Sequence, residues 1–394
     1  MNPPSAQKPS GKLVVEVGLL FLRLGLTAFG GPAAHIAMLE DEVVRRRGWL
    51  TGEEFLDLLG ATNLIPGPNS TEMAIHIGYR RAGRVGLVVG GVAFILPAML
   101  LVMAIAWAYV RFGKLPQVEG LLYGLKPVLV AIVIQALWSL GQKAVKDRFC
   151  AALGSVAILL TLAGVNELAV LFGAGTVAAL SQGIRSTPAR GAGTTRLALA
   201  PVVSAAALTT GSSLAVAGTS AFGLGPLFLV FLKIGSVLFG SGYVLLAFLR
   251  ADLVERRGWL TELQLMDAIA VGQFTPGPIF TAATFVGYLL GGTPGALVAT
   301  VGIFLPAFFF VAISGPLVPR LRASPTAGAF LDGVNVASLA LMTVVTWQLG
   351  RVAVVDVPTI VLAAVGGVLL LRYRVNSAWL VLGAGVVGWL LGTG

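Results

Sequence analysis

"FLRLGLTAFGGPAAHIAMLEDEVVRRRGWLT", residues 21–51, returns as "FLKIGSVLFGSGYVLLAFLRADLVERRGWLT" at residues 231–261. With a constant offset of 210 and no gap, 14 of the 31 positions are identical. Chance matches between two hydrophobic segments would not align these motifs in one register, so the chain consists of two related halves. We predict a cytoplasmic tail at 1–12, a first repeat at 13–195, a connecting span and linker at 196–222, and a second repeat at 223–394.

The composition places the chain in a lipid bilayer. Hydrophobic residues make up 57% of the 394 positions and charged residues 11%, with a mean hydropathy of +0.91. A soluble domain usually carries about a quarter charged residues. Apolar stretches long enough to cross a membrane as helices recur along the chain, which predicts an all-α polytopic protein with about 13 transmembrane helices. The predicted crossings are 13–39, 52–79, 85–110, 117–141, 149–165, 168–184, 197–217, 226–249, 262–288, 295–315, 325–350, 352–371 and 376–393.

The charge pattern argues for a membrane protein and against nucleic acid as a partner. The net charge is +10, but Lys and Arg cluster in short connectors such as 80–84, 143–148 and 185–196. This distribution is typical of cytoplasmic loops under the positive-inside rule. The single cysteine, Cys150, excludes a disulfide framework and a multi-thiolate metal site. We expect no metal and no cofactor.

The same charges predict that the second half is inverted relative to the first. Three arginines lie within 80–84, whereas the equivalent segment 287–295 carries no charge. Seven crossings separate equivalent helices in the list above, and an odd number inverts the repeat. If residues 52–79 instead form a re-entrant hairpin, the parity changes and the halves are parallel.

Both halves carry a Pro-Gly-Pro motif inside an apolar segment, at Pro66, Gly67 and Pro68 and at Pro276, Gly277 and Pro278. In inverted-repeat transporters, interrupted helices meet near the bilayer midplane and direct their free amides at anions. Pro68 then occupies the first turn of a new helix, whose donors come from Asn69, Ser70 and Thr71. The second motif offers Thr281. The alternative interpretation is a structural kink.

Two cations lie at equivalent positions about ten residues into predicted crossings, where a charge is expensive. These residues, Arg23 and Lys233, predict an anion site. Snorkelling to the interface, or neutralisation by a partner such as Glu16, is the alternative. Glycine-rich segments follow each cation, with Gly30 and Gly31 in the first half and Gly240 and Ser241 in the second. Their amides could form an anion-binding concavity, or the small residues could serve close helix contact.

Glu72 and His76 lie four residues apart, on one helix face just beyond the first Pro-Gly-Pro motif. An acid and a histidine at membrane depth are candidate proton carriers. The second half has Ala282 and Val286 at these positions, so a proton role would belong to one half. A polar brace between helices is the alternative.

The whole pattern resembles the chromate ion transporter family, in its two-domain long-chain type. The resemblance rests on Phe29 to Pro32 (FGGP), on Pro66 to Asn69 (PGPN) and on Glu72, and it covers nearly the whole chain. It implies a bacterial inner-membrane protein with antiparallel halves that exports chromate, with sulfate as the related oxyanion. In the second copy "FGSG" replaces FGGP and Ile279 replaces Asn69, which favours a substrate site in the first half.

We therefore expect a secondary active transporter that exports chromate by alternating access, from an anion site near the interrupted helices. A transporter for sulfate or another oxyanion, or an anion channel, is the alternative. An intramembrane enzyme is disfavoured because the predicted spans contain no serine elbow, aspartate dyad or metal-ligand cluster. The expected partners are a chromate-like or sulfate-like oxyanion and the lipid bilayer, and the sequence leaves a homodimer open.

Overall fold

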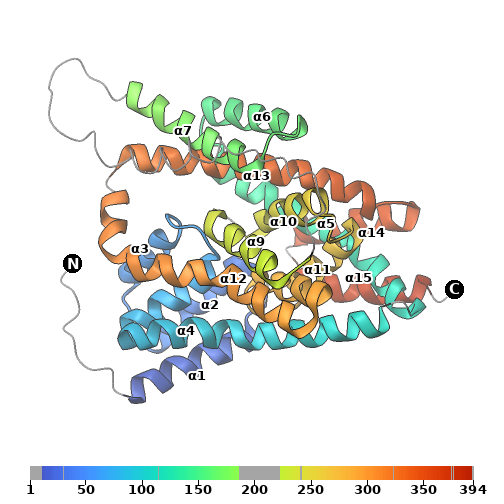
Figure 1. The fold of residues 1–394 in the computed structure, drawn as a ribbon, viewed down its shortest axis with the longest axis horizontal. Coiled ribbons are helices and arrows are strands. Elements are labelled where there is room, and N and C mark those ends of the chain that lie inside the picture. The colour runs from blue at the N-terminus through green and yellow to red at the C-terminus, as the bar shows by residue number, and fades with distance from the viewer. Residues whose placement is uncertain are drawn as a thin grey trace.

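The computed structural model describes residues 11–29, 31–113, 115–185, 222–239, 242–322, 324–373, 375 and 377–392. All regular secondary structure in this part of the chain is helical, with no strand (Figure 1). The predicted all-α class is therefore confirmed. The predicted crossing at 197–217 and the predicted site residues Gly30, Gly240 and Ser241 lie outside the described residues.

The two halves present equivalent helices in the same order. The first half contains α1 (Gly11–Thr27), α2 (Gly31–Glu40), η1 (Asp41–Arg46), α3 (Gly52–Thr62), α4 (Asn69–Phe112), α5 (Pro116–Ala144), α6 (Arg148–Leu162) and α7 (Glu167–Arg185). The second half contains α9 (Leu224–Val237), η2 (Gly242–Val244), α10 (Leu245–Leu249), η3 (Arg250–Arg256), α11 (Glu262–Phe274), η4 (Ile279–Thr281), α12 (Ala282–Arg322), α13 (Pro325–Ala353), α14 (Val357–Tyr373) and α15 (Ser377–Gly392).

The predicted crossings that carry a repeated motif are split into two helices. The segment 13–39 forms α1 and α2, and the segment 52–79 forms α3 and the start of α4. The second half is divided at the equivalent places. Glycine and proline explain these breaks, because glycine tolerates non-helical backbone and proline removes an amide donor.

A sharp turn at Ala82 and Gly83 divides α4 into two arms. Gly83 has φ 61°, and a Cβ added to Gly78 on the first arm would lie 2.2 Å from the Gly86 carbonyl oxygen on the second. The arms therefore pack with their backbones in contact, as a helical hairpin. A turn at Gly292 divides α12 in the same way. Both turns fall between separately predicted crossings.

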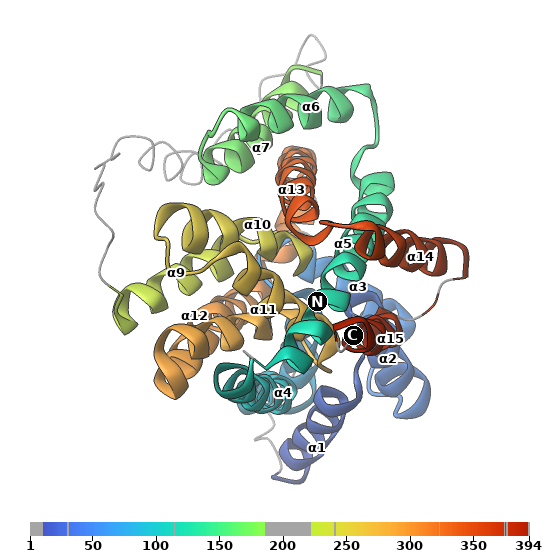
Figure 2. The same cartoon turned by 90° about the vertical axis from the view of Figure 1, so that its right-hand side faces the viewer.

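The C-terminal helices of each half pack on the other half. Helix α1 packs on α4 and α9 packs on α12, each within its own half. By contrast, α6 and α7 pack on α13 of the second half, while α14 and α15 pack on α5 of the first (Figure 2). Each half thus completes the other, which is the pattern expected from two repeats related by a pseudo-two-fold axis.

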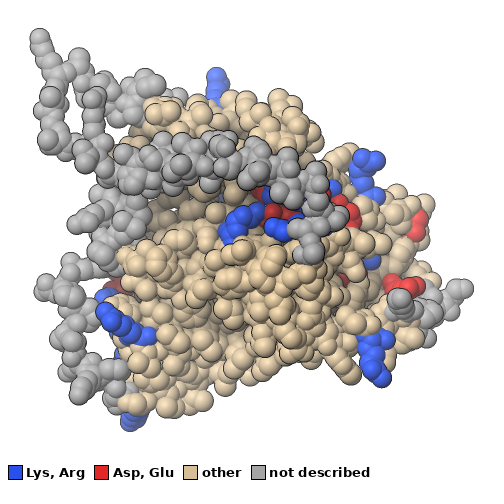
Figure 3. All heavy atoms as spheres, viewed as in Figure 1, with Lys and Arg blue, Asp and Glu red and all other residues tan. Residues whose placement is uncertain are grey.

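In the part of the chain that the structure describes, four helices are long and apolar enough to cross a membrane: Asn69–Phe112, Val118–Ala144, Ile279–Ser314 and Pro325–Ala353. Shorter apolar helices accompany them, among them α6, α9, α14 and α15. Most of the face shown in Figure 3 is uncharged, and large apolar side chains such as Trp138 and Trp347 are exposed. These features are those of a multi-pass helical membrane protein.

Candidate functional site

Each Pro-Gly-Pro loop is hydrogen-bonded to the helix break of the opposite half. The Gly67 amide donates to the carbonyl of Leu238 at 2.8 Å, and the Gly277 amide donates to the carbonyl of Ala28 at 2.9 Å. Ala28 and Leu238 are equivalent in the repeat, and each directly follows the first helix of its half. Both loops and both breaks therefore meet at the interface between the halves.

The central glycine of each loop has a backbone and surroundings that exclude a side chain. Gly67 has φ +142° and Gly277 has φ +91°, values that L-residues rarely adopt. A Cβ on Gly277 would lie 2.7 Å from the Cβ of Ala98. A Cβ on Gly67 would lie 2.3 Å from a carboxylate oxygen of Glu72 and, at ordinary contact distance, 3.6 Å from the Cβ of Ala307. Ala98 and Ala307 each follow a helix proline, so the close approach is itself repeated.

Helix α4 begins with two unpaired amides. Pro68 is the N-cap of this helix rather than part of its first turn. Its carbonyl accepts hydrogen bonds from the amides of Thr71 and Glu72, at 2.8 and 3.0 Å. Within the described residues, the amides of Asn69 and Ser70 have no acceptor. These donors lie at the positive end of a helix dipole, an arrangement that suits an anion.

The polar side chains near the two loops have different surroundings. The Asn69 side-chain amide donates to Asn63 at 2.7 Å and so joins the two ends of the first loop. The Thr281 hydroxyl donates to the Pro278 carbonyl at 2.8 Å, within its own turn. In contrast, the buried Thr71 hydroxyl has no partner among the described residues. Asn69 and Thr281 thus brace the loops, whereas Thr71 remains available.

Glu72 is wholly buried in the first turn of α4. Within the described residues neither carboxylate oxygen has a hydrogen-bond partner, and one oxygen lies directly beside Gly67. His76 is buried one turn later, and its Nε2 has no partner in the same part of the chain. Buried polar groups without partners are uncommon and demand an explanation. Glu72 makes none of the hydrogen bonds that a brace between helices requires.

Both cations of the predicted anion site are paired with acidic side chains. Arg23 contacts the carboxylate of Glu42 in η1, and Lys233 Nζ lies 2.6 Å from the carboxylate of Asp252 in η3. Glu42 and Asp252 are equivalent in the repeat, so the two halves neutralise their cations in the same way. The alternative interpretation named Glu16 as a neutralising partner of Arg23, but the partner is Glu42, and Glu16 pairs with Arg47 and Arg81.

A hollow of about 300 Å³ borders the Arg23 ion pair, and its lining combines the polar side chains of Thr27, Asp41, Glu42 and Arg46 with the apolar Leu24 and Met38. Arg23 itself is about half exposed there, with 51% of its side chain accessible. An average water takes up about 30 Å³ in the liquid, so the hollow has room for a small hydrated ion.

A buried ion pair between the halves has no counterpart in the sequence predictions. Lys126 in α5 lies 3.3 Å from Asp267 in α11, and the Tyr109 hydroxyl of α4 donates to the other Asp267 oxygen at 2.8 Å. The signal for this site is the lysine within the predicted crossing 117–141, since a charge at membrane depth usually has a function or a partner. In the second half, where a one-residue deletion before Pro306 changes the offset from 210 to 209, Asn335 occupies the position of Lys126.

The Lys126–Asp267 pair should contribute to stability mainly by mutual neutralisation. In Asp267→Asn the lysine is left buried without its counter-charge, and we expect the unfolding free energy to fall by about 3 to 5 kcal/mol. The double variant Lys126→Met/Asp267→Asn should recover most of this loss. Thermal unfolding in detergent measures both variants, and equal melting temperatures for the single and the double variant would contradict the expectation.

One family model matches the chain twice. This model, described as Chromate transporter, matches residues 15–179 and again residues 225–389. The chain belongs to the chromate transporter family. The two matches begin 210 residues apart, which is the register of the internal repeat. Each match contains one helix break, one Pro-Gly-Pro loop and one of the paired cations.

Relatives of similar length support the family assignment. The chain is 33% identical to a chromate transport protein of Cupriavidus metallidurans, over 95% of this chain and 92% of that protein. It is 32% identical to a chromate transport protein of Pseudomonas aeruginosa, over 94% and 91%. A probable chromate transport protein of Synechococcus elongatus is 29% identical over 88% and 86%. The family resemblance found in the sequence is confirmed, and no solved structure matches the chain.

Proposed function

We propose that this protein is a secondary active transporter that exports chromate across the bacterial inner membrane, with its N-terminus in the cytoplasm. The relatives named as chromate transport proteins support the substrate. The observation that carries the proposal is the reciprocal bonding of Gly67 to Leu238 and of Gly277 to Ala28. It brings the interrupted helices of both halves to one interface, where transporters built from repeats bind their substrates.

In this proposal the anion binds beside the first Pro-Gly-Pro loop. The unpaired amides of Asn69 and Ser70 supply neutral donors. Ile279 takes the place of Asn69 in the second half, so the first half contributes more of the contacts. Arg23 and Lys233 supply positive charge along the path when they exchange their carboxylate partners for the anion. The exchange is feasible because a carboxylate and an oxyanion accept hydrogen bonds from the same cationic donors.

We further propose that the halves are inverted in the membrane. The arginines at 80–84 and the uncharged equivalent segment support opposite sides for equivalent loops. At about 1.5 Å per residue, α3 and the first arm of α4 are each too short to cross about 30 Å of hydrocarbon alone. They cross as a broken helix in this proposal, whereas a re-entrant hairpin would make the halves parallel.

The membrane potential alone can drive export of a dianion. Moving one charge through 100 mV is worth about 2.3 kcal/mol, so a dianion gains about 4.6 kcal/mol, equivalent to roughly a thousandfold gradient or more. Selectivity is the harder requirement, because sulfate is also a tetrahedral dianion and an open pore would lose it. Alternating access meets this requirement, whereas an ungated pore does not.

Removing either cation should impair transport. In Arg23→Ala and Lys233→Ala we expect the apparent affinity for chromate to fall about tenfold or more, since a charge-assisted contact contributes about 1.5 to 3 kcal/mol. Arg45→Ala is the matched control, because Arg45 is more exposed and lies 3.5 Å from Glu40 in the same segment. Normal chromate affinity in both variants, at normal protein levels, would show that Arg23 and Lys233 do not bind the transported anion.

Transport in vesicles tests the function itself. Purified protein should carry labelled chromate in response to an imposed voltage, and unlabelled substrate on the opposite side should accelerate exchange. Competition by sulfate exceeding that by chromate would identify a sulfate transporter. Conductance that ignores the anion on the opposite side would identify a channel.

A further inference from the structure

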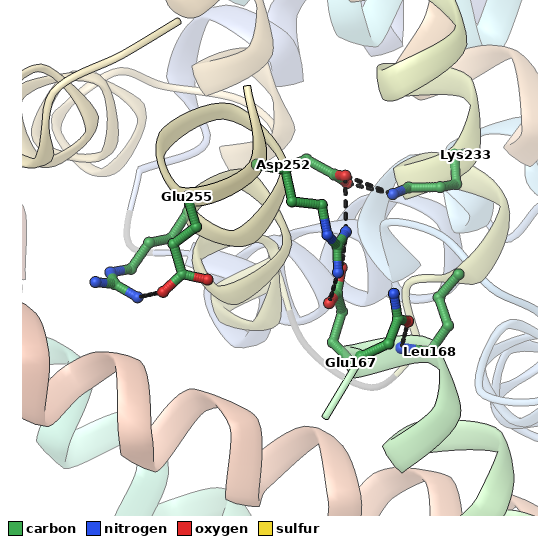
Figure 4. Close-up of polar contacts among 8 residues, drawn as sticks. Glu167, Leu168, Lys233, Asp252 and Glu255 are labelled. Carbon is green, nitrogen blue, oxygen red and sulfur yellow. Dashed lines mark hydrogen bonds and ion pairs between the residues drawn. The ribbon is translucent and has the colours of Figure 1, made fainter. Parts of the chain in front are cut away.

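The ion pairs of Arg23 and Lys233 belong to two equivalent clusters, one in each half. In each cluster a cation from the helix before the break meets an acid from the following π-helix, which is η1 in the first half and η3 in the second. A second arginine lies one turn beyond that acid. The first cluster consists of Arg23, Glu42 and Arg46, with Arg46 3.3 Å from Glu42. The second consists of Lys233, Asp252 and Arg256, with Arg256 2.9 Å from Asp252 (Figure 4).

The second cluster contains one additional acid, Glu167, the first residue of α7. Both oxygens of its carboxylate contact the Arg256 guanidinium, one of them at 2.6 Å from Nη1 and the other at Nη2. Figure 4 shows Glu167 reaching the cluster from α7, a helix that belongs to the first half but packs on the second. This two-point contact therefore ties the exchanged end of one half to the π-helix of the other.

Within the described residues, the first cluster receives no such acid from the end of the second half, and its Arg46 pairs instead with the neighbouring Asp41 at 2.7 Å. In the repeat register "VNE" at 165–167 corresponds to "VNS" at 375–377, so Ser377 takes the place of Glu167. The clusters differ in exposure accordingly. The side chains of Arg23 and Arg46 are 51% and 64% exposed beside the hollow, whereas those of Lys233 and Arg256 are 33% and 36% exposed.

The contact between Glu167 and Arg256 has the chemistry of oxyanion binding. A guanidinium donates two parallel hydrogen bonds to a carboxylate, and it binds a tetrahedral oxyanion through the same fork. Glu167 is only 7% exposed, so its carboxylate occupies an enclosed position between the two halves. A tetrahedral dianion can present two of its oxygens to the same fork and carries twice the charge of the carboxylate.

We propose that the Lys233–Arg256 cluster is a second oxyanion site at the end of the transport path opposite the Arg23–Arg46 cluster, and that Glu167 closes it as a built-in substitute anion. This inference rests on the proposed function and adds to it how one end of the path is closed. In this state the Arg23–Arg46 cluster is open and the Lys233–Arg256 cluster is latched. An arriving oxyanion displaces Glu167 from Arg256 and so releases α7 from η3.

The test compares chromate binding by the full-length protein and its Glu167→Gln variant in detergent, by equilibrium dialysis. Removal of the competing carboxylate should raise the affinity about tenfold, and the added change Arg256→Gln should abolish the gain. Glu167→Ser, which copies the residue of the other half, should act like Glu167→Gln. Glu255→Gln is the matched control, because Glu255 lies in the same π-helix but pairs with Arg250.

The outcomes separate this proposal from the proposed function. Unchanged affinity in a folded Glu167→Gln protein, or an equal gain in Glu255→Gln, overturns the latch. If Glu167→Gln does not fold, Glu167→Ser supplies the same comparison. Absence of chromate transport by the wild type in vesicles overturns the proposed function instead. The role proposed for Glu167 is then tested by the same binding comparison made with sulfate. A higher sulfate affinity in Glu167→Gln than in the wild type supports that role, and an equal affinity overturns it.

Discussion

Replacing Gly277 by alanine should abolish chromate transport while the protein remains inserted in the membrane. Gly277 has φ +91°, where an L-residue is strained by about 1 to 3 kcal/mol. The new Cβ would lie 2.7 Å from the Cβ of Ala98 and 3.3 Å from the Gly25 carbonyl oxygen, and such overpacking costs about 1 to 3 kcal/mol more. The loop must therefore move away from the first half and lose its hydrogen bond to Ala28.

Chromate uptake by inverted vesicles, normalised to the amount of protein, measures this effect. We expect a loss of about a hundredfold, because the strain and overpacking together amount to about 2 to 6 kcal/mol, a range that includes the roughly 2.7 kcal/mol that this factor represents. Gly48→Ala tests positive φ alone, since Gly48 has φ +59° and open space around the added atom. Gly141→Ala tests a helical glycine with equally open surroundings. Transport by Gly277→Ala at the wild-type rate would show that the Pro-Gly-Pro loops do not lie on the transport path.

The repeat register predicts much of the site. Identical motifs 210 residues apart must fold alike, so the equivalence of the two loops, the two breaks and the two cations follows from residues such as Gly67 and Gly277 alone. The repeat register does not predict whether a Pro-Gly-Pro loop contacts the helix break of its own half or that of the other half. Both arrangements satisfy the same alignment. Only the folded chain shows that Gly67 reaches Leu238.

The partners of the buried charges are harder to predict for a related reason. Glu42 lies in a connector where acids and arginines balance, and such a segment is expected at the membrane surface rather than against Arg23. Lys126 and Asp267 come from different halves. Asp267 matches Asp57 in the repeat, but Asn335 replaces Lys126 in the second copy, so a search for repeated features passes over the pair. Residues that differ between the two halves must therefore be examined one by one, because the repeat does not predict their contacts.

Glu72 is the asymmetric residue for which we expect the second large effect. Its carboxyl group is wholly buried beside the first loop, and neither oxygen has a hydrogen-bond partner within the described residues. A negative charge there would repel a dianion held by the amides of Asn69 and Ser70. Proton binding at Glu72 and anion binding at the loop should therefore favour each other, and by linkage the coupling is reciprocal.

Glu72→Gln keeps the shape of the protonated side chain and removes its titration. We expect exchange of chromate for chromate to persist in this variant, whereas the acceleration of net transport by an imposed pH gradient falls about tenfold, since a coupling free energy of about 1.4 kcal/mol suffices for that factor. Glu53→Gln, an exposed acid in α3, is the control. His76→Gln shows whether the neighbouring histidine contributes to the remaining pH dependence. An unchanged response to the pH gradient in Glu72→Gln would mean that the proton takes another route.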